Sequence, residues 1–242
     1  MNMCIYKWLY ALLAAIHPQR KARKDFRRLK NDLKSISSYS QEGEDLILQR
    51  ILNHPKEGFY IDVGAHHPFR FSNTALLYKR KWRGINIEAN PSQLESFKRY
   101  RPRDINLNLL VGNQSKEIDF YFFNDSALNT SSPEIAQNLI DEGKFKFLKK
   151  EKVIPWKLEE IINKFAPEIT NIDYLNIDVE GLGLSVLESN NWNKHSPSVI
   201  SIELLSCNDF EQLKQFKEYL FLKEKGYSLE AKTPNTAFFT KL

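Results

Sequence analysis

Cysteine is scarce in this chain of 242 residues. Only Cys4 and Cys207 occur, far apart and in no Cys-x-x-Cys arrangement. Disulfide frameworks and thiolate zinc sites need several cysteines at short spacings, so the sequence predicts neither. A protein with so little use for cysteine suits a reducing compartment, and we expect a cytoplasmic location.

A long apolar run is also lacking. The apolar segment 3–16 is shorter than the roughly 20 residues that cross a bilayer, and it has no signal-peptide cleavage pattern. A basic stretch, 19–34, follows it. Such a pair suits a helix lying on the inner face of an anionic membrane, so peripheral membrane contact through residues 3–30 is one interpretation. The other is a helix packed on the domain or on a partner.

The net charge of +5 comes from that basic stretch, and the rest of the chain is near neutral. The charge therefore predicts no nucleic-acid partner. A polar stretch, 35–40, is the one credible boundary, which divides the chain into an N-terminal apolar and basic helical extension, 1–38, and a domain, 39–242. The sequence does not indicate an oligomeric state.

Alternating β-rich and helical segments predict the fold of the domain. Strands are expected at 58–64, 84–90 and 104–111, with helices at 73–81, capped by Ser72, and at 92–100 between them. This β-α-β-α-β order favours a parallel sheet with right-handed crossovers. Farther along we expect a strand at 118–123, a weak helix at 134–148, a helix at 158–165, strands at 174–179 and 198–204 with a helix at 182–189 between them, one helix at 210–225 and a hairpin at 228–240.

Ligands of open parallel sheets bind beyond the carboxyl ends of the strands. Asp62 and Gly64 end the first strand, and Glu88 ends the second, where a carboxylate can accept hydrogen bonds from both ribose hydroxyls of an adenosine-bearing cofactor. Each signal alone also fits an ordinary strand-end turn. The loop Gly64-Ala-His-His-Pro-Phe lacks the Gly-x-Gly-x-x-Gly pattern, so a nicotinamide-dependent oxidoreductase has low weight.

Acidic residues also follow the fourth strand of the sheet. Asp178 and Glu180 could act as a general base, orient a substrate or hold a divalent ion, or they could simply favour the start of the next helix. His66 and His67 could supply a base, but adjacent histidines tend to point apart and we expect no metal site. Glu203, at the end of the fifth strand, is a further residue for the pocket lining.

Six motifs together resemble the FkbM family of methyltransferases that use S-adenosylmethionine (SAM). They are Tyr39-Ser-Gln-Glu-Gly-Glu-Asp45, Gly58-Phe-Tyr-Ile-Asp-Val-Gly-Ala65, Ser72-Asn-Thr74, Trp82-Arg-Gly-Ile-Asn-Ile-Glu88, Arg103-Asp-Ile-Asn-Leu-Asn108 and Asn176-Ile-Asp-Val-Glu-Gly181. The resemblance covers residues 39–205. It implies a Rossmann-like class I methyltransferase fold: a mostly parallel seven-stranded sheet with a C-terminal antiparallel hairpin.

The resemblance also implies roles for individual residues. Asp62 and Gly64 match the cofactor loop, Glu88 the ribose carboxylate, Asn108 a residue near the adenine, and Asp178 with Glu180 the Asp-x-Glu-Gly element. The expected cofactor-binding set is Asp62, Gly64, Ala65, Asn73, Glu88, Ala89 and Asn108, and the expected catalytic set is Asp178, Glu180 and His66. The chain departs from the common family form at His66-His67 and at Leu182-Gly183, which affects the expected contacts with the acceptor.

The implied activity is O-methylation of a glycan or small-molecule acceptor, such as a sugar hydroxyl of a surface glycan or glycolipid precursor. The alternative is a non-catalytic module on the same fold that docks on membrane or on a partner. Methyl transfer needs little beyond in-line positioning and a base for a hydroxyl acceptor. Binding of SAM and formation of a methylated product distinguish the two.

Overall fold

The computed structural model describes residues 37–54, 56–125, 128–179, 181–205, 207 and 209–242. The chain divides into two compact units, Met1–Ser37 and Ser38–Leu242, and every element named below lies in the second. The expected membrane-contacting segment, 3–30, lies outside the described residues. Within the described residues, no helix is both long enough and apolar enough to cross a membrane.

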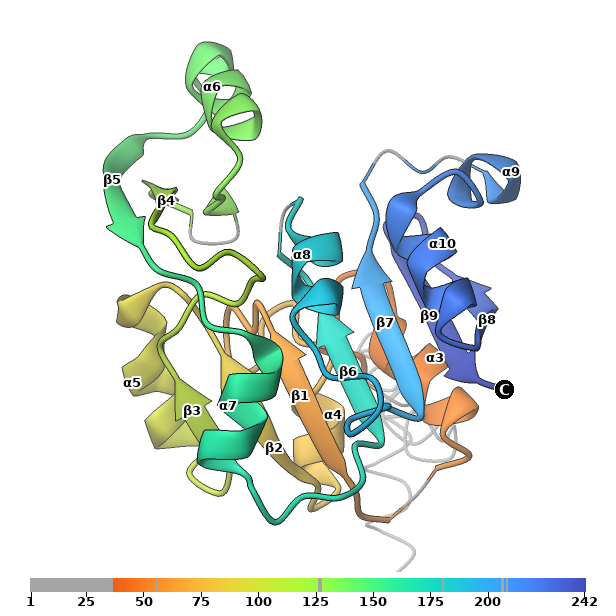
Figure 1. Cartoon of the computed structure of the whole chain (residues 1–242). Coiled ribbons are helices and arrows are strands. Elements are labelled where there is room, and N and C mark those ends of the chain that lie inside the picture. The colour runs from red at the N-terminus through yellow and green to blue at the C-terminus, as the bar shows by residue number, and fades with distance from the viewer. Residues whose placement is uncertain (1–36, 55, 126–127, 180, 206, 208) are drawn as a thin grey trace, which may run out of the picture. The chain divides into compact units, whose positions relative to one another are not determined.

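A seven-stranded sheet forms the centre of the domain, in the order β3-β2-β1-β6-β7-β9-β8 (Figure 1). The first five strands in this order run parallel, and β9 pairs antiparallel with both β7 and β8. The expected mostly parallel sheet with a C-terminal antiparallel hairpin is therefore confirmed. The strands are β1 (Phe59–Val63), β2 (Arg83–Ile87), β3 (Ile105–Leu107), β6 (Tyr174–Ile177), β7 (Val199–Glu203), β8 (Tyr227–Lys232) and β9 (Thr236–Lys241).

Helices cover both faces of the sheet because buried parallel strands present apolar side chains on each side. On one face, Leu48 of α3 (Glu44–Ile51) and Leu77 of α4 (Ala75–Lys79) pack against Tyr60 and Tyr174. On the other, the large apolar cluster joins Ile61 and its neighbours to α7 (Leu158–Phe165), α8 (Gly183–Glu188) and α10 (Lys217–Glu224). Between β2 and β3 lies α5 (Pro91–Tyr100), which begins at Pro91 and is capped by Asn90.

A small antiparallel ribbon is inserted between β3 and α7. It pairs β4 (Ile118–Phe123) with β5 (Phe147–Val153), and α6 (Pro133–Glu142) connects them. In Figure 1 this insert stands above the carboxyl ends of the sheet strands. The expected helix over 134–148 was too long, because Gly143 adopts a left-handed conformation (φ 65°) that ends α6, and the chain then turns into β5.

Two other expected helices differ from the structure. The segment expected as one helix over 210–225 forms α9 (Phe210–Leu213) and α10, with an extended residue, Phe216, between them. Leu213 and Leu222 are both fully buried, and on one continuous helix residues nine apart would face opposite sides. The helix expected over 73–81 begins at Ala75, although Ser72 Oγ still accepts from the Ala75 N–H (3.1 Å).

Candidate functional site

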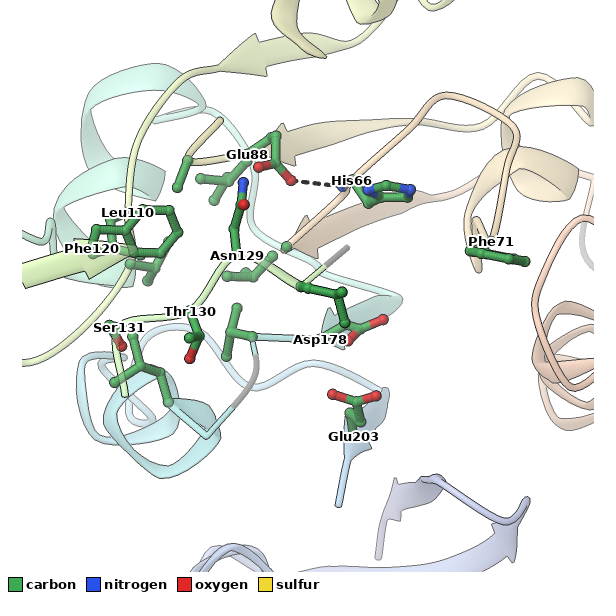
Figure 2. Close-up of a pocket in the computed structure, with 18 of the residues that line it drawn as sticks. His66, Phe71, Glu88, Leu110, Phe120, Asn129, Thr130, Ser131, Asp178 and Glu203 are labelled. Atoms are coloured by element: carbon green, nitrogen blue, oxygen red, sulfur yellow. Dashed lines mark hydrogen bonds between the residues drawn. The ribbon is translucent and has the colours of Figure 1, made fainter. Parts of the chain in front are cut away.

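A cavity of about 360 Å³ lies at the carboxyl ends of the sheet strands, beneath the insert. Its volume falls within the roughly 300–1,000 Å³ typical of small-molecule sites. The ends of β1, β2, β6 and β7 form one side, and the insert together with the loop after β1 forms the other. Figure 2 shows the side chains that face it, among them His66, Glu88, Leu110, Phe120, Asn129, Asp178 and Glu203.

Gly64 lets β1 and β6 approach each other at the floor of the cavity. Its φ is +79°, and a Cβ atom there would lie 1.8 Å from the backbone oxygen of Asp178. Its N–H donates to Ile87 O (3.0 Å), so the residue also fixes β1 to β2. Gly64 is needed for this close packing of the backbone, whatever occupies the cavity above it.

Glu88 follows β2, and its carboxylate is held by two backbone groups. The N–H of His66 donates to Oε2 (2.8 Å) and that of Asn90 donates to Oε1 (2.7 Å). A carboxylate has about four acceptor positions, so each oxygen keeps capacity for a ligand hydroxyl. Burial raises the pKa of Glu88 to about 7; the two N–H groups oppose this rise, and the charges of Asp62 and Asp178 add to it.

Asp178 and Glu203 form a carboxyl pair in the same cavity, as Figure 2 shows. Asp178 comes directly after β6, and Glu203 is the last residue of the neighbouring strand β7. Burial raises the pKa of Asp178 to about 6, a hydrogen bond with Glu203 opposes the rise, and the negative charges of Asp62 and Glu44 add to it. Two carboxyl groups this close favour a state in which one proton is shared between them.

The loop after β1 contributes His66, Arg70 and Phe71 to the lining. His66 and Phe71 have left-handed backbone conformations (φ 51° and 56°), which is uncommon for residues other than glycine and often marks functional loops. Burial, together with the nearby Arg70 charge, lowers the pKa of His66 to about 4. His67 does not line the cavity, and its Nδ1 accepts from the N–H groups of Phe69 and Arg70.

Arg70 connects the two walls of the cavity. Its Nη2 lies 3.5 Å from Asp125 Oδ2 at the end of the insert's first strand, and its Nη1 lies 3.3 Å from His66 Nε2. Both members of the ion pair are partly exposed, so the pair contributes little to stability. No group of three His, Cys, Asp or Glu side chains with metal-holding geometry occurs within the part of the chain that the structure describes.

The opposite end of the cavity is apolar on one wall and polar on the other. Leu110 and Phe120 are almost fully buried there, beside Ala89. The insert adds the short polar side chains Asn129, Thr130 and Ser131, which Figure 2 shows between this apolar wall and the acidic pair. The cavity therefore offers an apolar surface, a carboxylate in its middle, and a second acidic group at the far end.

The structure brings together Gly64, His66, Glu88, Ala89 and Asp178 from the expected site residues. It does not bring the Asp62 side chain into the cavity. Asp62 is 2% exposed, and its two oxygens accept from Thr74 Oγ1 (2.5 Å) and Asn176 Nδ2 (2.8 Å). Thr74, at the start of α4, and Asn176 of β6 therefore hold both carboxylate oxygens of Asp62, and its expected contact with the cofactor stays a prediction.

Three more expected residues lie outside the cavity lining. Asn73 is buried and donates to Asn176 Oδ1 (3.1 Å). Asn108 donates from Nδ2 to the backbone oxygens of Glu88 and Ala89 (both 2.8 Å), so it supports the end of β2 from outside. Ala65 is buried beside the lining residues. Glu180 lies outside the described residues, and its catalytic role stays a prediction.

The sequence matches the family model of the methyltransferase FkbM domain over residues 62–229, more than half of the chain. The chain belongs to the FkbM methyltransferase family. The match begins at Asp62, so the motif that starts at Tyr39 lies before it, and it extends beyond the 39–205 range of the expected resemblance. No curated protein matches the sequence.

Solved methyltransferase structures are similar to this FkbM methyltransferase at low identity. One is a precorrin-6y C5,15-methyltransferase from Geobacter metallireducens GS-15 (12% identity, 87% of this chain, 95% of that chain, TM-score 0.45). A second is a putative caffeoyl-CoA O-methyltransferase from Staphylococcus aureus (12%, 96%, 98%, TM-score 0.43). A third is a TehB-like SAM-dependent methyltransferase from Corynebacterium glutamicum ATCC 13032 Kitasato (12%, 94%, 100%, TM-score 0.40).

Sequence reasoning named none of the individual residues that the insert contributes to the FkbM methyltransferase site. The polar loop after β4 gave no local sign that Asn129, Thr130 and Ser131 would face the strand ends, because polar loops are usually solvated. Arg70 and Phe71 were also missed. Their closeness to His66 in the sequence was a usable signal, since a loop that carries one lining residue often carries others.

Proposed function

We propose that this FkbM methyltransferase transfers a methyl group from SAM to a hydroxyl of a sugar, in a surface glycan or a glycolipid precursor. The observation that carries the proposal is a single cavity with two carboxyl groups of raised pKa, Glu88 and Asp178, each suited to a different task. Perturbed acids gathered in one cavity are typical of functional sites.

The chemistry of the Glu88 end fits an adenosyl group. Its carboxylate can accept from both ribose hydroxyls, while Leu110 and Phe120 offer an apolar wall for the adenine. When bound, SAM supplies an electrophilic methyl group on a sulfonium. Leu110 and Phe120 keep water away from that part of the cavity.

Asp178 is the residue that suits the general base. A carboxylate with a pKa of about 6 is ionised at neutral pH, yet it is basic enough to accept the proton of an acceptor hydroxyl. Glu203, hydrogen-bonded beside it, can keep the Asp178 carboxylate oriented. His66 suits the task less, because a group whose pKa is about 4 is a weak base and is already neutral at neutral pH.

The rest of the cavity lining supports a polyhydroxylated acceptor. Gln41 and Asn235 contribute carboxamide residues to the cavity lining, and Thr130 and Ser131 contribute hydroxyl residues to it from the insert. Side chains that both donate and accept can satisfy several sugar hydroxyls at once. Comparing surface glycans from cells with and without the gene by mass spectrometry tests the acceptor, and an unchanged set of methylated sugars contradicts it.

Binding of S-adenosylhomocysteine (SAH) is expected to weaken as pH falls through 7. Below a pKa of about 7 the Glu88 carboxyl gains a proton and becomes a donor facing the ribose hydroxyls. With a pKa of about 7, the ionised fraction of Glu88 falls about tenfold between pH 8 and pH 6, and the affinity measured by titration calorimetry should fall by about the same factor.

Glu88→Gln is expected to lower SAH affinity by roughly 10- to 100-fold at pH 8, because it removes a charged hydrogen-bond acceptor. The same change should abolish the pH dependence between 6 and 8. Glu95→Gln on the exposed face of α5 is the matched control and should behave as the native protein does. Native-like affinity in Glu88→Gln would contradict the ribose assignment.

We also propose peripheral membrane contact through residues 3–30, since an apolar segment followed by a basic stretch suits an anionic surface. The full chain should sediment with phosphatidylglycerol vesicles at low salt and much less with phosphatidylcholine vesicles. Equal sedimentation with both kinds of vesicle, or with neither, would count against this contact.

A further inference from the structure

A row of polar side chains crosses the sheet just below the cavity. Asn106, Asn86, Asp62, Asn176 and Ser201 come from β3, β2, β1, β6 and β7, and each is the direct register partner of the next. Four of the five are at most 3% exposed, and Asn106 is half-buried. Parallel strands buried on both faces are usually apolar throughout, so a polar row at this depth needs a reason.

Hydrogen bonds connect the row from one side of the sheet to the other. On β3 and β2, Asn86 Nδ2 donates to Asn106 Oδ1 (2.8 Å). On β1, β6 and β7, Asn176 Nδ2 donates to Asp62 Oδ1 (2.8 Å), and Ser201 Oγ donates to Asn176 Oδ1 (2.6 Å). Only the step between Asn86 and Asp62 has no direct hydrogen bond.

Arg101 and Thr74 connect Asn86 to Asp62 through hydrogen bonds. Arg101 is fully buried, and its Nη1 donates both to Asn86 Oδ1 (3.1 Å) and to Thr74 Oγ1 (2.7 Å). Thr74 Oγ1 in turn donates to Asp62 Oδ2 (2.5 Å). The same guanidinium donates to Pro68 O (2.6 Å from Nη2), in the loop that carries His66 and Arg70. The hydrogen-bonded row therefore also holds the loop after β1.

Four of the five members of the row stand two residues before a residue that lines the cavity. Asp62 precedes Gly64, Asn86 precedes Glu88, Asn176 precedes Asp178 and Ser201 precedes Glu203. A strand advances about 6.6–6.8 Å over two residues, so a change in register at the row would displace the site residues directly. This spacing also places Asp62 too low in the sheet to face the cavity.

We propose that Asp62 is a positioning residue, which together with Asn176 fixes the relative register of β1 and β6 so that Gly64, Glu88 and Asp178 meet around one cavity. The inference rests on the proposed function for its ligand readout, while a second readout needs no ligand. It differs from the direct cofactor contact that the sequence pattern favoured, and the two accounts predict different outcomes for one pair of substitutions.

The donor and acceptor of the Asp62–Asn176 hydrogen bond can be exchanged within this network. In Asp62→Asn alone, the new amide N–H₂ must face a group that donates in the native protein, because Asn176 and Thr74 donate to the two oxygens of Asp62. In the double variant Asp62→Asn/Asn176→Asp, the new amide donates to the new carboxylate. That carboxylate can still accept from Asn73, Tyr174 and Ser201, which all donate to position 176 in the native protein.

The experiment compares native protein, Asp62→Asn, and the exchanged double variant, all well below their melting temperatures. We expect Asp62→Asn to lower SAH affinity by roughly 10- to 100-fold, as loss of an outer partner does at metal sites. The double variant should return to within about threefold of native. If Asp62 touched the ligand, the double variant would bind SAH as weakly as Asp62→Asn does, and this result would overturn the proposal.

Amide hydrogen exchange supplies the readout that needs no ligand. The amides of Gly64 and His66 donate to Ile87 O and Glu88 Oε2, so they report the meeting of β1 and β2. They should exchange roughly tenfold faster in Asp62→Asn, regain protection in the double variant, and leave the amides of α7 unchanged. Uniformly faster exchange, or a lowered melting temperature with native SAH affinity, would show a merely structural role. If the native chain bound no SAH, the proposed function would fail, and the pattern of amide hydrogen exchange in the three proteins would still decide the positioning role.

Discussion

Gly64→Ala is expected to lower the free energy of unfolding by more than about 3 kcal/mol. The substitution forces a residue with a Cβ into a left-handed conformation, which costs about 1–2 kcal/mol. It also places that Cβ 1.8 Å from the backbone oxygen of Asp178, so β1 and β6 must move apart. Thermal unfolding should show a melting temperature lower by at least about 6 °C.

The matched control is Gly226→Ala. Gly226 has nearly the same backbone conformation (φ +83°, against +79° for Gly64), but a Cβ there meets no atom within 4 Å. Gly226→Ala should lower the free energy of unfolding only by the backbone strain, about 1–2 kcal/mol. If the two variants lost equal stability, the close approach between Gly64 and Asp178 would not be important. SAH affinity should also fall in Gly64→Ala, since the strand ends that carry Glu88 and Asp178 separate.

Asp178→Asn is expected to lower methyl transfer by roughly 10²- to 10⁴-fold, the range typical of a lost general base. An amide keeps the shape of the side chain and can still hydrogen-bond Glu203, but it cannot accept the acceptor's proton. SAH affinity should stay within about threefold of native, because the proposed ribose contact belongs to Glu88. The assay follows the transfer of a deuterated methyl group from SAM into glycans of cells that lack the gene.

Asp119→Asn is the control for this assay, since Asp119 is a surface residue of the insert paired with Lys150. It should transfer at the native rate. Two results would remove Asp178 from the role of base: native-like transfer by Asp178→Asn, or a parallel loss of SAH binding and transfer. The second result would show instead that Asp178 shapes the cofactor end of the cavity. A rate of transfer that rises between pH 5 and pH 7 is also expected, since the Asp178 carboxyl loses its proton near pH 6.

The difference between Asp62 and Glu88 shows how far a strand-end pattern can be interpreted. Both were expected to face the cofactor, because both are acidic residues at the ends of neighbouring strands. Asp62 is the last residue but one of β1, whereas Glu88 comes one residue after β2 ends. Those few ångströms along the strands, together with the donors Thr74 and Asn176, place one carboxylate in a buried network and the other in the cavity.

The sequence by itself determined the order of the strands of the main sheet along the chain, the family, and the convergence of Gly64, Glu88 and Asp178, because apolar periodicity and strand-end motifs are local signals. Only the tertiary structure decided which polar residues serve a ligand and which serve the sheet. Hydrogen-bond partners such as Asp62 and Asn176 lie far apart in the sequence, and the insert that closes the cavity folds over strand ends it does not adjoin in the chain. Contacts of that kind depend on the packing of the whole domain, so no local pattern could specify them.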